Sequence, residues 1–152
     1  MRYLLGLGNF AMGDDSVGLR IVEHIVEQDL DKGFEAIEVG NNGMLVLTYF
    51  RDDTDALLVV DAVRHGETPG NFTIFAPEDV ETQKVAGGIS THEGDILKLI
   101  ELAKQIDQPI PPIKILAIEP ESMEMNPELS PALKDRFQEY VLAATEEMRR
   151  NT

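Results

Sequence analysis

Short apolar runs alternate with longer amphipathic segments along this chain of 152 residues. Runs with the length and composition of buried strands occupy residues 2–7, 34–39, 56–60, 71–76 and 113–118. Segments with apolar residues at helical spacing occupy residues 15–28, 43–51, 91–106 and 131–149. This alternation predicts an α/β fold, a three-layer α/β/α sandwich around a mostly parallel five-stranded sheet. The length predicts one domain that covers residues 1–152.

The segment 71–76 is expected to run against its neighbours in the sheet. Only nine residues separate Asp61 from Asn71; they include glycine and proline and show no helical spacing. A crossover between parallel strands usually needs about a dozen residues or more. We therefore expect 71–76 to be the one antiparallel strand.

The net charge of −15 restricts the partners of this chain. A polyanion such as nucleic acid would be repelled, and no stripe of lysine or arginine offsets the charge. The chain contains no cysteine, so any metal ligands must be carboxylates or imidazoles. The first apolar run is too short for a signal peptide or a membrane span. We expect a cytoplasmic protein, a monomer, with neither nucleic acid nor membrane as a partner.

The first candidate site is the segment from Gly6 to Asp15, which follows the first expected strand. A dinucleotide-binding G-x-G-x-x-G would need glycine at position 11, where Ala11 stands. Two acids, Asp14 and Asp15, also occupy the place where a pyrophosphate would rest, so nucleotide binding is rejected. One acid is enough to cap the following helix, and the adjacent pair therefore indicates a function as well.

Two further candidates come from strand 56–60 and from the segment 90–93. Asp61 follows a buried apolar strand and is expected at the carboxyl edge of the sheet, where α/β folds bind ligands; the alternative is a turn cap. Ser90 and Glu93 fit a capping box that starts helix 91–106, and this directs His92 toward the same edge. His24, in mid-helix, and His65, in the turn after Asp61, lack such a setting.

Asp15, Asp61 and His92 are therefore expected to converge on one edge of the sheet. Two carboxylates and one imidazole form a metal-binding or general acid–base group, with an open position for water or substrate. The chain has no H-E-x-x-H motif, which excludes an ordinary zinc protease of that type.

These motifs resemble those of the hydrogenase maturation proteases, and the resemblance covers nearly the whole chain. It depends on GLGN-xxxx-DD-xx-G, on LLVVDAV around Asp61, on Ser90–Glu93 and on the late segment 118–122, Ile-Glu-Pro-Glu-Ser. The resemblance implies an endopeptidase that removes a short C-terminal extension from the large-subunit precursor of a nickel–iron hydrogenase after nickel insertion. It assigns nickel contact to Asp15, Asp61 and His92, and it implies that the nickel arrives with the substrate.

The implied mechanism is attack by a metal-polarised water on the scissile carbonyl, with Asp15 or Asp61 as general base. Three other functions share parts of this pattern. A nickel-binding maturation chaperone without hydrolytic activity would use the same three ligands. A receiver-type phosphoacceptor module would need lysine after the last strand, where Glu119 and Pro120 stand. A peptidyl-tRNA hydrolase shares Gly-Leu-Gly-Asn but has to grip RNA, which a charge of −15 opposes.

Overall fold

In a computed structural model, the backbone is described for residues 1–82 and 91–150, and side chains for residues 1–79 and 96–150. The strands are β1 (Arg2–Leu7), β2 (Glu35–Gly40), β3 (Ala56–Ala62), β4 (Phe72–Phe75) and β5 (Ile113–Ile118). The helices are η1 (Gly13–Ser16), α1 (Val17–Glu27), η2 (Gly43–Tyr49), α2 (Pro77–Thr82), α3 (Thr91–Gln105), α4 (Pro131–Lys134) and α5 (Phe137–Arg149), where η marks a 3-10 helix.

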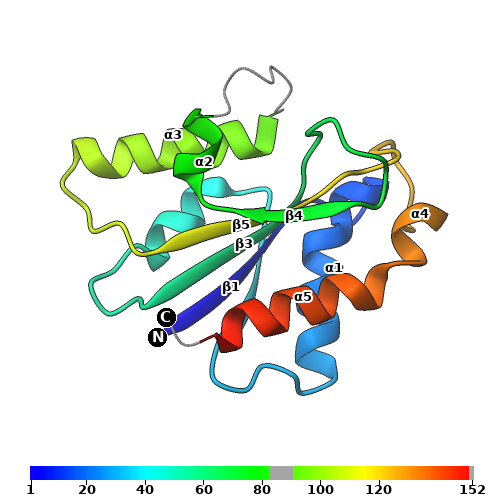
Figure 1. Ribbon diagram of the computed structural model, residues 1–152, viewed down its shortest axis with the longest axis horizontal. Helices are drawn as coiled ribbons and strands as arrows, with labels where there is room; N and C mark the ends of the chain where they lie inside the picture. Colours follow the sequence, from blue (N-terminus) through cyan, green and yellow to red (C-terminus); the bar gives the residue numbers. More distant parts are fainter. Residues whose placement is uncertain (83–90, 151–152) are drawn as a thin grey trace.

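The five strands form one sheet in the order β2-β1-β3-β5-β4. The pairs β1–β2, β1–β3 and β3–β5 are parallel, whereas β4 is antiparallel to β5. The helices α1 and α5 cover one face of the sheet, and η2 and α3 cover the other (Figure 1). The predictions of a three-layer α/β/α fold and of one antiparallel strand near 71–76 are confirmed.

Alternation of side chains along the strands gives this sheet two apolar cores. On β1 and β3, Leu4 and Leu58 pack against α1 and α5. The intervening Leu5 and Val59 pack against η2 and α3 on the opposite face. Both faces of these central strands are therefore buried, and the polar chemistry of the chain is confined to the strand ends and the loops.

Four local expectations differ from the structure. The predicted helical segment 43–51 is a 3-10 helix, Gly43–Tyr49, and the amide of Phe50 donates to the carbonyl of Leu47 at its end. Segment 131–149 is broken into α4 and α5. The short helix α2 was not expected, and β3 continues past Val60 because its ladder with β5 extends to Ala62. Among the described residues, no helix is long and apolar enough to cross a membrane.

Candidate functional site

Asp15 is held at the carboxyl end of β1 by a tight turn. The turn begins at Gly8, whose φ is +131°, and a Cβ added there would lie 1.8 Å from the carbonyl oxygen of Asp15. Glycine is therefore required at position 8. Within the turn, the amide of Asp15 donates to the carbonyl of Met12 at 3.0 Å. The Asp15 residue is only 7% exposed.

Asp61 lies at the same edge, in the neighbouring strand. Its residue is 2% exposed, and its Oδ1 accepts a hydrogen bond from the amide of Ala62 at 2.8 Å. Because Gly6 pairs with Val60 in the β1–β3 register, Asp61 lies one position beyond the last pair. The first turn of α1 crosses these strand ends closely: a Cβ at Gly18 would lie 2.3 Å from the carbonyl oxygen of Val60. The fold therefore brings Asp15 and Asp61 to one carboxyl edge.

His92 belongs to the first turn of α3, and its side chain lies outside the described residues. So do Ser90 and the side chain of Glu93, which leaves the expected capping box untested. The helix α3 runs antiparallel to β5, so its first turn is directed toward the carboxyl edge of the sheet (Figure 1). Within the described part of the chain, no three His, Asp or Glu side chains form a group that could hold a metal ion. The convergence of all three residues stays a prediction.

Asp14 has a different role from its neighbour. It is fully buried, and its carboxylate accepts four hydrogen bonds. Oδ2 accepts from the amides of Glu121 and Ser122 at 2.8 and 3.1 Å and from the Ser130 hydroxyl at 2.8 Å. Oδ1 accepts from the amide of Ser130 at 2.7 Å. Asp14 therefore fastens η1 to the segment after β5, and only Asp15 of the acidic pair remains as a candidate for chemistry.

A second buried carboxylate, Glu119, fastens the loop that follows Asp61. Its Oε1 accepts hydrogen bonds from the amides of His65 at 2.8 Å and Glu67 at 3.1 Å. Its backbone also pairs with that loop, accepting from the amide of Gly70 and donating to the carbonyl of Asn71. Sequence reasoning missed this role, although segment 118–122 had been singled out. A glutamate directly after a buried strand was the available signal.

The two other histidines have structural surroundings. The ring of His24 packs edge-on against Phe137, with centroids 5.5 Å apart, as expected for a residue beside the core. His65 Nδ1 lies 2.8 Å from the carbonyl oxygen of Val63 and 3.3 Å from Oε1 of Glu119. A carbonyl oxygen only accepts, so Nδ1 carries the proton. His65 therefore helps to hold the loop in which it lies.

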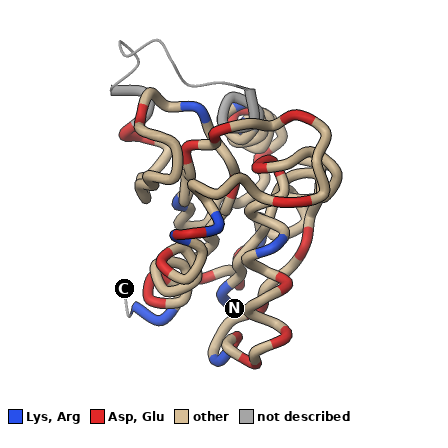
Figure 2. Tube along the Cα trace, turned by 90° about the vertical axis from the view of Figure 1, so that its right-hand side faces the viewer, with Lys and Arg blue, Asp and Glu red and all other residues tan. Residues whose placement is uncertain are grey.

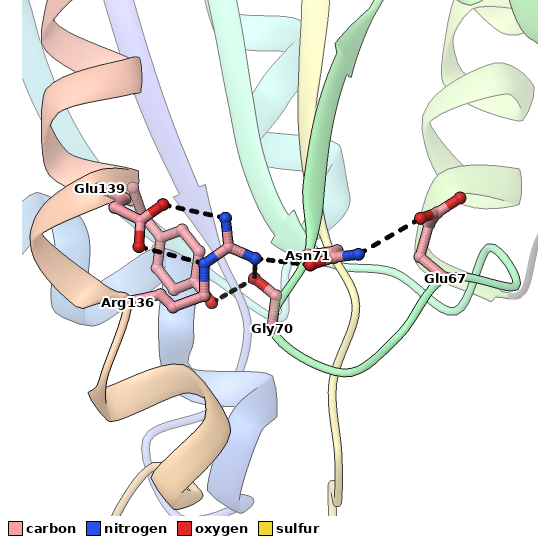
Figure 3. Close-up of polar contacts among 6 residues, drawn as sticks. Glu67, Gly70, Asn71, Arg136 and Glu139 are labelled. Atoms are coloured by element: carbon pink, nitrogen blue, oxygen red, sulfur yellow. Dashed lines mark hydrogen bonds and ion pairs between the residues drawn. The ribbon is translucent and has the colours of Figure 1, made fainter.

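The far end of the same loop is attached to α5 (Figure 3). Arg136 donates to the carbonyl of Gly70 at 3.1 Å and to Oδ1 of Asn71 at 2.6 Å, while a two-pronged ion pair with Glu139 orients its guanidinium. The hydroxyl of Tyr140 also donates to the carbonyl of Gly70, at 2.7 Å. Burial raises the pKa of Tyr140 to about 12, so this hydroxyl keeps its proton at neutral pH.

Comparison with known proteins places the chain among relatives of one kind. The model of the family "Hydrogenase maturation protease" (HycI) matches residues 19–147. The hydrogenase expression/formation protein HupD of Rhodobacter capsulatus is 27% identical over 148 residues, which cover 96% of this chain and 70% of the relative. The hydrogenase 2 maturation protease of Escherichia coli (strain K12) is 29% identical and is matched over 97% of this chain and 92% of its own.

Solved structures agree with these relatives. The hydrogenase maturating endopeptidase HybD from E. coli superposes with a TM-score of 0.77 at 26% identity, over 96% of this chain and 92% of that one. A [NiFe] hydrogenase maturation protease from Thermococcus kodakarensis, at 24% identity and a TM-score of 0.73, shares the fold. The chain therefore belongs to the hydrogenase maturation protease family. The predicted family is confirmed, and with it the class of enzyme, a protease.

Proposed function

We propose that this protease removes a short C-terminal extension from the large-subunit precursor of a nickel–iron hydrogenase, and that Asp15, Asp61 and His92 form its active site. The nickel is part of the substrate, and it arrives with the precursor. The observation that carries the assignment is the burial of Asp15, in the 3-10 helix that follows β1, and of Asp61, near the end of the neighbouring strand β3. The third acid, Asp14, is committed to four hydrogen bonds of the scaffold and takes no part in the chemistry.

The side chains of Asp15, Asp61 and His92 are suitable ligands for the nickel of the substrate. Carboxylate and imidazole ligands bind divalent nickel, and the chain has no thiolate that would compete for a softer metal. Bound nickel supplies Lewis acidity beside the scissile bond. Asp15 or Asp61 takes the proton of the attacking water, and the surrounding structure shields both residues from bulk water.

The test is cleavage of a nickel-loaded precursor by the wild-type protein and by Asp15→Asn, Asp61→Asn and His92→Ala. Each substitution is expected to lower the cleavage rate by at least about 100-fold, because it removes a metal ligand or the general base. His24→Ala, a change at the edge of the core beside Phe137, is the control and should leave the rate unchanged. Full-rate cleavage by Asp61→Asn or His92→Ala would show that the site is assigned wrongly.

The same assay separates a protease from a nickel-binding chaperone. A chaperone would bind the nickel-loaded precursor and leave its length unchanged. Mass spectrometry of the precursor before and after incubation detects the loss of the extension directly. An unchanged mass, with complex formation intact, would favour the chaperone.

Location and assembly belong to the same proposal. The protein acts in the cytoplasm as a monomer with a single domain, and it binds neither nucleic acid nor membrane. The net charge of −15 supports the absence of a nucleic-acid partner. Acidic residues are spread over the molecule, and basic residues lie scattered among them (Figure 2).

A further inference from the structure

Exposed apolar side chains lie beside Asp15, on two loops at the carboxyl edge of the sheet. Met125, in the loop after β5, is 82% exposed, and Phe10, in the loop after β1, is 38% exposed. Met12, between Phe10 and Asp15, is partly exposed. We call Phe10, Met12 and Met125 the apolar ridge. Large apolar side chains this exposed usually mark a contact surface when they gather in one place.

The two loops that carry the ridge are joined to each other through their backbones. Met12 forms an isolated β-bridge with Asn126, the neighbour of Met125. The amide of Asn126 donates to the carbonyl of Ala11 at 2.9 Å, and the amide of Gly13 donates back to the carbonyl of Asn126 at 2.9 Å. This pairing places Met12 and Asn126 side by side, although they are more than 100 positions apart in the chain.

Arg20 of α1 contacts both loops of the ridge, and it positions Phe10 before a partner binds. Its guanidinium lies 5.7 Å from the centre of the Phe10 ring and donates to the carbonyl of Pro127. Its Nε donates to the hydroxyl of Ser16 at 2.7 Å. One cation of α1 thus contacts both loops and the residue after Asp15. A surface ordered in advance loses little conformational entropy when it binds.

We infer that the apolar ridge binds the polypeptide of the precursor beside the scissile bond, through apolar side chains of that segment. This inference rests on the proposed function. The ridge lies next to the proposed active site, because the carbonyl of Met12 accepts a hydrogen bond from the amide of Asp15 in the same turn. Methionine suits such a contact, since its unbranched, polarisable side chain adapts to different partners.

Charge narrows the chemistry of the bound segment. Glu121 and Glu124 are exposed in the loop that carries Met125, and the protein has a net charge of −15. Basic side chains next to the apolar ones would complement this loop. The occupant is therefore an extended segment of the precursor that combines apolar and basic residues.

The experiment compares the double variant Phe10→Ser/Met125→Ser with the wild-type protein on the nickel-loaded precursor. We expect KM to rise about tenfold and kcat to stay within about twofold, because the ridge binds ground state and transition state alike. Titration calorimetry of the same precursor should show a matching rise in Kd. The double variant should fold normally, since both side chains are exposed.

Two matched controls carry the same kind of change far from the site. Leu142 on α5 is 58% exposed and Ile106 after α3 is 57% exposed, so Leu142→Ser and Ile106→Ser should leave KM and Kd unchanged. An unchanged Kd in the ridge variant, or an equal rise of Kd in the controls, would contradict the inference that the ridge binds the precursor. Absence of cleavage by the wild-type protein would instead overturn the proposed function, and the Kd comparison would still decide on the ridge.

Discussion

At the scale of single residues, the acidic pair Asp14–Asp15 divides its work between structure and chemistry. Both residues are buried. The Asp14 carboxylate accepts from the amides of Glu121, Ser122 and Ser130, whereas the backbone of Asp15 is hydrogen-bonded to Asn9 and Met12. Adjacent residues in a 3-10 turn point in different directions, which explains how neighbours acquire separate roles.

Asp14→Asn is expected to lower the free energy of unfolding by about 3 kcal/mol, because an amide replaces one acceptor oxygen among several charge-assisted hydrogen bonds. Urea denaturation measures this loss. Asp15→Asn should cost less stability and remove more activity.

Two results would contradict these roles of Asp14 and Asp15. If Asp14→Asn unfolded at the same urea concentration as the wild-type protein, the buried carboxylate would not be the clamp described. A lower cleavage rate with unchanged stability in Asp14→Asn would show that Asp14, to which we assign a structural role, takes part in the chemistry.

At the scale of elements, the approach of α1 to β1 and β3 sets the position of the site. The helix begins at Val17, and the next residue, Gly18, packs directly on the strand ends. A Cβ there would lie 2.3 Å from the carbonyl oxygen of Val60 and 2.6 Å from that of Leu7. Both obstacles are backbone atoms that have no rotamer with which to move away.

Gly18→Ala is expected to lower the free energy of unfolding by about 2 kcal/mol, since the overpacking outweighs the helix propensity gained. Gly43→Ala is the control, because a Cβ at Gly43 would meet only the end of the Leu99 side chain, at 3.5 Å. Thermal unfolding of both variants checks the difference. Equal melting temperatures would mean that α1 can shift away from the sheet at little cost.

The attachment of the β3–β4 loop to α5 gives a prediction in pH. The pKa of Tyr140 is raised from 10.0 to about 12 by burial, so the folded state keeps a proton that the unfolded state releases. This contribution to stability is complete below about pH 10 and is lost as the pH rises through about 12.

Tyr140→Phe should cost about 1 kcal/mol at pH 8, because the hydrogen bond to Gly70 is lost while Arg136 still donates to the same carbonyl. Between pH 10 and 12 the wild-type protein should lose more stability than the variant does. Urea denaturation at pH 8 and pH 11 measures both changes. Equal losses of stability in the two proteins would show that a group other than Tyr140 titrates in this pH range.

At the scale of the whole molecule, the net charge of −15 opposes compaction through repulsion among carboxylates. Acidic residues are spread over the molecule and do not gather in one place (Figure 2). Raising the ionic strength shortens the distance over which these charges interact.

The melting temperature is therefore expected to rise by a few degrees between about 0.05 and 0.5 M NaCl. Scanning calorimetry at these salt concentrations measures the shift. The same melting temperatures measured in a sodium salt without chloride control for specific anion binding. A lower melting temperature at high salt would show that surface ion pairs such as Lys134–Glu128 outweigh the repulsion.

The sequence by itself determined the layers, the antiparallel strand and the family of this protein. Apolar periodicity and loop length are local properties, and a motif such as Gly6–Asp15 can be recognised from the order of its residues alone. The positions of the carboxylates at strand ends were also readable, because parallel strands end at a common edge.

Only the tertiary structure decided what each polar residue does. The four hydrogen bonds of Asp14, the clamp at Glu119 and the bridge from Met12 to Asn126 all join segments distant in the chain. Such contacts depend on directions and distances that no local pattern encodes. The sequence predicted a metal site at the acidic edge of the sheet. The tertiary structure shows that Asp14 is used for hydrogen bonds of the scaffold and that the apolar ridge lies on the loops next to Asp15.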